Sequence, residues 1–240
     1  ERILKNLGDY INKREVRTGK KNFPKSFKKI TFNNISFKYL GTNNFIFKNF
    51  STEIKSNKIN AILGASGKGK STLIDMLPLL IEPTKGNITI DNLDTRLINI
   101  HSLRNSFAYV DQKPFFFKGS IIDNLSYCQK KVNVKVCIEA ARLARAHSFI
   151  QKLPGQYEYL LGESGSGLSG GQLQRLEIAK ALATKRKIII LDEPTSNLDN
   201  KRSKEILSTL VNINKKTKTT IIIISHKSAI IEISQNLIKL

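Results

Sequence analysis

A glycine-rich loop that carries a lysine and hydroxyl side chains could hold phosphate groups. The loop, which we name the P-loop, follows the apolar run 60–63, precedes a helical pattern and consists of Gly64, Ala65, Ser66, Gly67, Lys68, Gly69, Lys70, Ser71 and Thr72. Glycines let successive backbone N–H groups face phosphate oxygens, and a helix N-terminus favours negative charge. Lys70 would reach the β- and γ-phosphates, and the Ser71 hydroxyl would bind Mg²⁺. The loop therefore predicts a site for Mg-ATP or Mg-GTP.

Two acidic residues end an apolar run further along the chain. The run 188–191 has the composition of a buried strand and leads into Asp192 and Glu193. Open α/β sheets bind ligands at the carboxyl ends of their strands, so both carboxylates would face the phosphates. Asp192 would hold Mg²⁺, directly or through water, and Glu193 could act as general base for a water that attacks the γ-phosphate. The plainer alternative is that the two acids only cap the segment at Pro194.

A third segment, Leu168-Ser169-Gly170-Gly171-Gln172, precedes the acidic strand by about one helix. We name residues 168–172 the signature segment; it opens a helical run and forms a second helix N-terminus suited to phosphate. With these motifs in this order, the chain resembles the ABC ATPase family over about residues 30–240. The resemblance implies ATP hydrolysis with Mg²⁺ by two cassettes that close head-to-tail, each signature segment over the other's P-loop. The partner cassette would most simply be a second copy of this chain.

Further positions match the family's pattern. The resemblance implies that Tyr39 stacks on adenine and that Gln112 contacts Mg²⁺ and water. It also implies that Asp199 lies on a loop across the dimer interface and that His226 contacts the γ-phosphate. The plainer readings are a core aromatic, an ordinary glutamine, a helix N-cap and a strand-capping histidine. Lys68 stands where many relatives have Ser or another small residue. Its positive charge would lie either beside the phosphates or in solvent.

The resemblance thus assigns a complete set of site residues. Catalytic roles are expected for Glu193, His226, Lys70 and Gln112. Magnesium ligands are expected to be Ser71, Gln112 and Asp192. The residues expected to bind the nucleotide are Tyr39, Gly64, Ala65, Ser66, Gly67, Lys68, Gly69, Lys70, Ser71, Thr72, Ser169, Gly170, Gly171, Gln172 and Asp199.

Two stretches resemble the exporters within this family. Residues 115–125 look like the segment that exporters carry after their glutamine, and Gly162-Glu163 resembles their coupling loop, although Ser164 and Leu160 depart from it. The segment 195–199 is most similar to peptide and bacteriocin exporters. Lipid or drug export, a soluble ABC ATPase that acts on nucleic acid, and a nucleotide-binding module without hydrolysis stay as alternatives. Because the cassette is single and compact, we expect no nucleic-acid partner.

The pattern of apolar residues predicts the elements that position these side chains. Residues 30–63 alternate with period two and are β-rich, which indicates antiparallel strands. Strands at 60–63, 188–191 and 220–224 alternate with helical stretches, as in a parallel sheet covered by helices. Residues 113–168 read as an inserted helical subdomain. The predicted fold is α/β: a P-loop NTPase core with a mostly parallel sheet, an N-terminal antiparallel β subdomain and that insertion.

The first 28 residues differ from the rest of the chain. Ile3, Leu7, Tyr10 and Ile11 share one face of a predicted amphipathic helix, and a basic segment with Pro24 follows. We expect residues 1–28 to be a helix and linker from a preceding transmembrane region, and residues 29–240 to be the nucleotide-binding domain. The absence of an initiator Met favours a chain cut from a longer polypeptide.

Composition limits the class of protein. The chain has 240 residues, 40% of them hydrophobic, and a formal net charge of +21, which attracts polyanions or an anionic membrane face but also fits a general bias in residue usage. The presence of only two cysteines, Cys128 and Cys137, argues against a secreted disulfide framework and favours a reducing cytosol. Apolar runs fall far below the ~20 residues that span a bilayer. We expect a location on the cytoplasmic face of the cell membrane.

Overall fold

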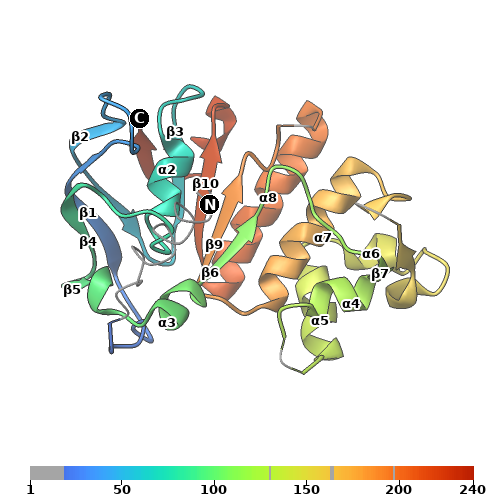
Figure 1. Cartoon of the computed structure of the whole chain (residues 1–240). Coiled ribbons are helices and arrows are strands. Elements are labelled where there is room, and N and C mark those ends of the chain that lie inside the picture. Colours follow the sequence, from blue (N-terminus) through green and yellow to red (C-terminus); the bar gives the residue numbers. More distant parts are fainter. Residues whose placement is uncertain (1–18, 130, 163–164, 197) are drawn as a thin grey trace, which may run out of the picture.

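The computed structural model describes residues 19–129, 131–162, 165–196 and 198–240. It confirms the α/β fold, with a parallel sheet in the middle of the molecule (Figure 1). The strands are β1 (Lys29–Phe37), β2 (Phe47–Lys55), β3 (Ile59–Leu63), β4 (Lys85–Ile90), β5 (Leu93–Asp94), β6 (Phe107–Val110), β7 (Gly119–Ser120), β8 (Leu160–Leu161), β9 (Ile188–Asp192), β10 (Thr220–Ser225) and β11 (Asn236–Lys239). The α-helices are α2 (Lys70–Asp75), α3 (Ile100–Arg104), α4 (Ile121–Ser126), α5 (Val134–Leu143), α6 (His147–Ile150), α7 (Gly170–Ala183) and α8 (Asn200–Thr217). Short 3₁₀ helices are η1 (Thr95–Leu97), η2 (Gln156–Glu158) and η4 (Ser228–Ile230).

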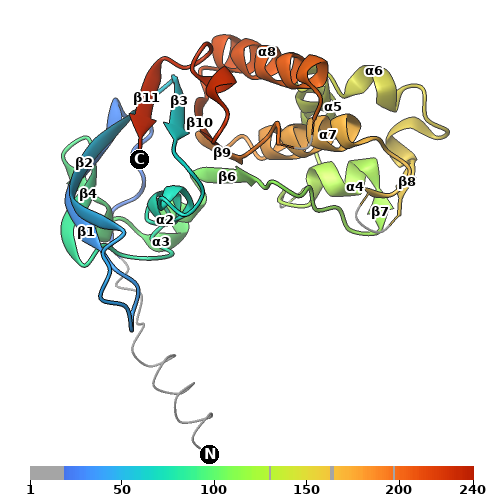
Figure 2. The ribbon, with the colours of Figure 1, turned by 90° about the horizontal axis from the view of Figure 1, so that it is seen from above.

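The central sheet is parallel and is covered on both faces. Its strand order is β11-β3-β10-β9-β6. Successive residues of β10 enter different cores: Ile221 and Ile223 pack with residues of α5, α7 and α8, whereas Ile222 and Ile224 pack with residues of α2, α3 and the antiparallel sheet. Figure 2 shows these two sets of elements on opposite sides of the sheet. Because both faces are covered, the strands read as continuous apolar runs rather than as alternating ones.

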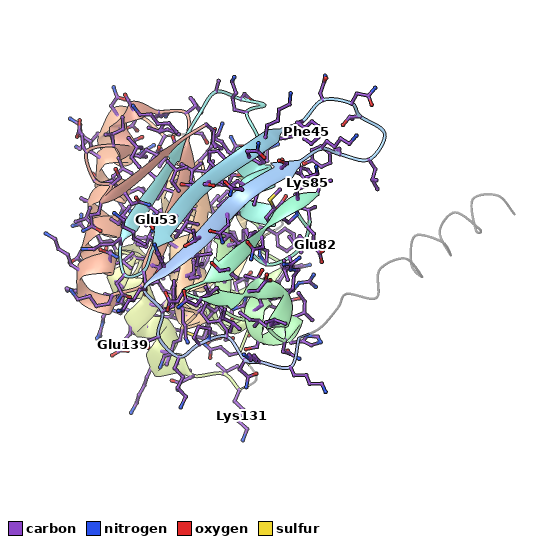
Figure 3. All side chains as sticks on the ribbon, turned by 90° about the vertical axis from the view of Figure 1, so that its left-hand side faces the viewer. Phe45, Glu53, Glu82, Lys85, Lys131 and Glu139 are labelled. Atoms are coloured by element: carbon purple, nitrogen blue, oxygen red, sulfur yellow. The ribbon has the colours of Figure 1, made fainter. Side chains whose placement is uncertain are left out.

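The antiparallel sheet has the order β2-β1-β4-β5, as the period-two pattern predicted for its first strands. Its inward residues, such as Phe32 and Ile54, are buried in the same core as the apolar side chains of the P-loop helix α2. Figure 3 looks onto this sheet, with Phe45 and Lys85 at one end and Glu53 toward the other. Strand β2 begins at Phe47, near the end of the sheet that Phe45 marks. The P-loop contacts this start of β2, because Gly69 lies against Ile46 and Phe47.

The segment 113–168 contains α4, α5 and α6, as its helical pattern predicted, and also a short ladder that the pattern did not show. Strands β7 and β8 pair antiparallel, Gly119 with Leu161. Ser120 then caps α4 in a capping box with Asp123, which satisfies free backbone N–H groups at the start of that helix. Two-residue strands carry too little periodicity to be read from sequence.

The basic segment before β1 packs against the domain. Lys21 pairs with the backbone around Ile98, and the N–H of Phe23 donates to Ser102 Oγ at 2.8 Å. Phe23 and Phe27 are buried in the core, with ring centroids 5.6 Å apart. The boundary expected at residue 28 thus falls inside packed structure. Residues 1–18, with the expected amphipathic helix, lie outside the described residues.

Within the ranges that the structure describes, no helix has the length and apolar character needed to cross a bilayer.

Substituting Phe23→Ala tests whether this segment belongs to the folded domain. Loss of a buried aromatic ring should lower the free energy of unfolding by roughly 3 kcal/mol, measured by denaturant titration. The exposed neighbour Asn22→Ala is the matched control and should change it by less than about 0.5 kcal/mol. Equal stabilities of the two variants would show that the segment is only a tether.

Candidate functional site

Parallel register brings four strand ends to one edge of the sheet. Ser225 of β10 pairs with Leu63 of β3, and Ile224 pairs with Asp192 of β9. On the other side of β9, Val110 of β6 pairs with Leu191. The residues that follow these ends are the P-loop, His226, Glu193 and Gln112. Segments far apart in the sequence therefore meet at one edge, as the strand-end argument predicts.

The P-loop is closed around its lysine. Lys70 is buried, with 8% exposure, and its Nζ donates to the carbonyl oxygens of Gly64 at 2.8 Å and Ala65 at 2.9 Å. Gly69, at the N-cap of α2, has φ 88°, and a Cβ there would lie 2.4 Å from Ile46 Cγ2. Only glycine fits both the left-handed backbone and this close approach. Lys68 is exposed at the tip of the loop.

Tyr39 is attached to the P-loop helix through its hydroxyl. The Tyr39 oxygen lies 2.9 Å from Thr72 Oγ1, and the ring packs edge-on against Phe37 at 5.0 Å. The side chain is 46% exposed, which excludes the plain reading of Tyr39 as a core aromatic. The side chain thus lies half-exposed beside the P-loop helix, and its contact with adenine stays a prediction.

The two acids at the end of β9 have different surroundings. Glu193 Oε1 lies 2.8 Å from His226 Nδ1, and Glu193 holds a φ of 45°, with its N–H donating to Ile224 O at 2.9 Å. Burial raises the pKa of Asp192, and the nearby carboxylates of Glu193 and Asp111 raise it further. A left-handed glutamate and a carboxylate with a raised pKa mark a site built for a ligand rather than for stability.

The donors at this edge fit Mg²⁺. Asp192, the Ser71 hydroxyl and the Gln112 side chain supply hard oxygen atoms, and Ser71 and Gln112 are exposed to an incoming ligand. A cation would oppose both the burial and the carboxylate repulsion that raise the pKa of Asp192. In the described parts of the chain, no cluster of three or more His, Cys, Asp or Glu side chains could hold a metal ion.

The signature segment forms a helix N-terminus, as expected. Ser169 caps α7 in a capping box: the N–H of Gln172 donates to Ser169 Oγ at 3.4 Å, and the N–H of Ser169 donates to Gln172 Oε1 at 2.8 Å. A Cβ on Gly170 would meet nothing within 4 Å, so the backbone there is open to solvent. The segment presents free N–H groups outward.

A hollow beside this N-terminus joins it to the start of α8. Ser169, Gly171 and Gln172 line it together with Asp199, which caps α8 by accepting from the N–H of Arg202 at 2.8 Å. The described lining of this hollow includes no residue of the P-loop. The structure thus places the P-loop, Asp192, Glu193, Gln112 and His226 at one sheet edge, and Gly170 of the signature segment lines a cavity together with Gln112 and Glu193. Glu163 lies outside the described residues.

Comparisons with known proteins agree with this geometry. A family model described as ABC transporter matches residues 47–196. The chain belongs to the ABC transporter family. It is an ATP-binding domain of the exporter type and an ATPase of that family.

Individual relatives of this ABC domain are exporters of several kinds. It is 38% identical over 236 residues to the alpha-hemolysin translocation ATP-binding protein HlyB of Escherichia coli O157:H7, covering 98% of this chain and 33% of that protein. It is 38% identical over 207 residues to the ATP-dependent lipid A-core flippase of Syntrophus aciditrophicus, covering 86% of this chain and 34% of that protein. The solved structure of a bacterial Atm1-family ABC exporter with ATP bound matches with TM-score 0.82 and 32% identity, covering 92% of this chain and 38% of that one. The chain spans about a third of the length of these relatives.

Sequence reasoning missed two acidic neighbours of the ABC site. Asp111 and Asp75 both raise the pKa of Asp192. Asp111 stands directly before Gln112, so the strand-end argument could have found it. Asp75 lies four residues after Ser71 on the P-loop helix, one turn further along, and only the folded structure shows how it faces β9.

The raised pKa of Asp192 predicts a stabilising substitution. Ionised Asp192 destabilises the nucleotide-free domain, and this penalty is absent below its ordinary pKa of 3.8 and develops as pH rises through the raised folded pKa. Asp192→Asn should therefore raise Tm at neutral pH without nucleotide, leave it unchanged in acid, and weaken Mg²⁺-dependent ATP binding. The exposed Glu232→Gln is the control. A neutral-pH Tm for Asp192→Asn at or below that of the parent chain would refute this electrostatic account.

Proposed function

We propose that this domain binds and hydrolyses Mg-ATP as the motor of an ABC exporter, with two copies closing head-to-tail around two nucleotides. The observation that carries the proposal is the Glu193–His226 pair at the same sheet edge as the P-loop. A carboxylate fixed by a histidine beside a phosphate-binding loop is the arrangement that water attack on a γ-phosphate needs.

Each residue has a part in this reaction. Lys70 releases the loop carbonyls and binds the β- and γ-phosphates, whose oxygens also receive the backbone N–H groups of the P-loop. Ser71 and Asp192, with Gln112, would hold Mg²⁺, which supplies neutralisation of the phosphate charge that develops during transfer. Glu193 accepts the proton of the attacking water through one carboxylate oxygen. His226 holds the other oxygen through its Nδ1, and the family resemblance implies that it contacts the γ-phosphate.

The second copy is supported by the presence of two helix N-termini suited to phosphate in one chain. The P-loop begins α2, whereas the signature segment begins α7, which spans 14 residues. As the family resemblance implies, the signature segment that covers each nucleotide comes from the other cassette. Head-to-tail pairing of two identical cassettes forms two such sites, because each cassette gives its signature segment to the other.

A membrane partner is supported by apolar side chains on the helical part of the domain. Phe115 is 66% exposed, Tyr127 72% and Leu160 72%. The rings of Phe117 and Tyr127 lie in contact in a tilted arrangement, with centroids 5.2 Å apart. Exposed large apolar side chains on one part of a domain favour an interaction surface there. We assign it to transmembrane helices of the same native polypeptide, which places the domain on the cytoplasmic face of the membrane.

The transported substrate belongs to one of three classes: peptide or protein, lipid, or drug. The resemblance of residues 195–199 to peptide exporters and the similarity to a hemolysin translocation protein favour a peptide or protein. Similarity to a lipid A-core flippase and to the multidrug resistance protein sirA of Leptosphaeria maculans supports lipid or drug export almost equally. A reconstituted full-length protein assayed with peptide, lipid and drug would separate the three.

Glu193→Gln tests the hydrolytic role. Because the amide cannot accept a proton, turnover should fall by roughly 10²–10⁴-fold, while Mg-ATP binding measured by a fluorescent analogue stays intact. Glu139→Gln, an exposed site on α5, should leave both unchanged. Turnover by Glu193→Gln equal to that of the parent would remove Glu193 from the role of base.

A further inference from the structure

A small cavity connects the catalytic edge with the signature helix α7 of the same chain. Its volume is about 80 Å³, larger than the roughly 10–15 Å³ that one water requires. The lining residues are Gln112, Pro114, Gly170, Leu173, Gln174, Glu193, Pro194, Ser196 and Leu198. It thus touches the proposed base, the glutamine beside it and the beginning of α7.

Gln174 is the buried polar side chain in this lining. It is 6% exposed, and its Nε2 has no hydrogen-bond partner among the described residues. A buried amide without a partner is costly, and such groups in folded proteins usually pair with protein or with ordered water. Other polar side chains in the lining are those of Gln112, Glu193 and Ser196, and Gln112 Nε2 donates to Ser196 Oγ at 3.4 Å.

We propose that Gln174 is a positioning residue that links α7 to Gln112 and Glu193 through water held in this cavity. The inference rests on the proposed function and deepens it. The Gln174 amide donates to the water, and the water donates to the Glu193 carboxylate or to Ser196. Any shift of α7 when the signature segment engages the partner's nucleotide then moves the base of its own subunit, so the two sites of a pair are coupled within each chain.

A purely structural role for Gln174 makes the same prediction about stability and a different one about turnover. An apolar side chain of the same shape removes the unpartnered amide and fills the same space, so it should leave the fold as stable or more stable. If the amide only packs, the substitution also leaves the ATP turnover unchanged. If the amide positions Glu193, turnover falls although the fold does not weaken. The turnover of a variant that remains as stable as the parent therefore separates the two roles.

The experiment compares Gln174→Met with the parent chain in Mg-ATP turnover, fluorescent-nucleotide binding and thermal unfolding. We expect kcat to fall roughly 10- to 100-fold, the usual cost of losing a residue that orients a reacting group. The KM and the binding affinity should stay within about twofold of the parent, and Tm should be unchanged or higher. Gln174→Leu repeats the test with a second apolar side chain if Met packs poorly.

Gln129→Leu is the matched control. Gln129 lies in the same helical part, outside the cavity lining, and donates to Ala183 O at 3.2 Å, so its loss should lower Tm and leave kcat unchanged for the folded fraction. Retention of kcat by Gln174→Met would overturn the inference while the parent's Glu193-dependent turnover still supports the proposed function. A parent chain without such turnover would overturn both.

Discussion

In-register parallel pairing of β3, β10, β9 and β6 is the constraint on which the site depends. Ser225 lies opposite Leu63, and Ile224 opposite Asp192, so the residue after each strand end is fixed to within one position. A slip of one residue would turn every side chain of a strand to the other face. The pairing is held by isoleucines such as Ile222 and Ile223, which are buried in separate cores on the two faces. The packing of the two cores therefore fixes the positions of the site residues that follow the strand ends.

The same edge gathers features that cost stability. Glu193 adopts a left-handed backbone, and burial, followed by the effect of neighbouring carboxylates, raises the pKa of Asp192. Gly69 has no room for a side chain. In the proposed function, a cation would compensate the charge of Asp192, and the phosphates would take the place of the loop carbonyls at Lys70. In this proposal, the nucleotide-free domain is less stable because its site is already arranged for the ligand.

Much of this could be predicted from the sequence, for identifiable reasons. The P-loop, the acids after β9 and the signature segment occupy continuous stretches whose spacing and apolar flanks are visible in one dimension. Gln174 could not be found in this way, because its importance comes from a cavity whose walls are distant in sequence. The burial of Phe23 and Phe27 was hidden by lysines around them, and the β7–β8 ladder is too short to show a period. Long-range packing decides each of these cases.

Cysteine cross-linking between two copies tests the central claim that the P-loop of one cassette meets the signature segment of another. Lys68→Cys and Ser169→Cys are combined in a Glu193→Gln chain whose exposed Cys128 is replaced by Ser. We predict a disulfide-linked dimer on a non-reducing gel that forms with Mg-ATP and is absent from either single cysteine variant. No linked dimer with saturating Mg-ATP, or equal linkage in the single variants, would contradict head-to-tail closure and the composite ATP site built on it.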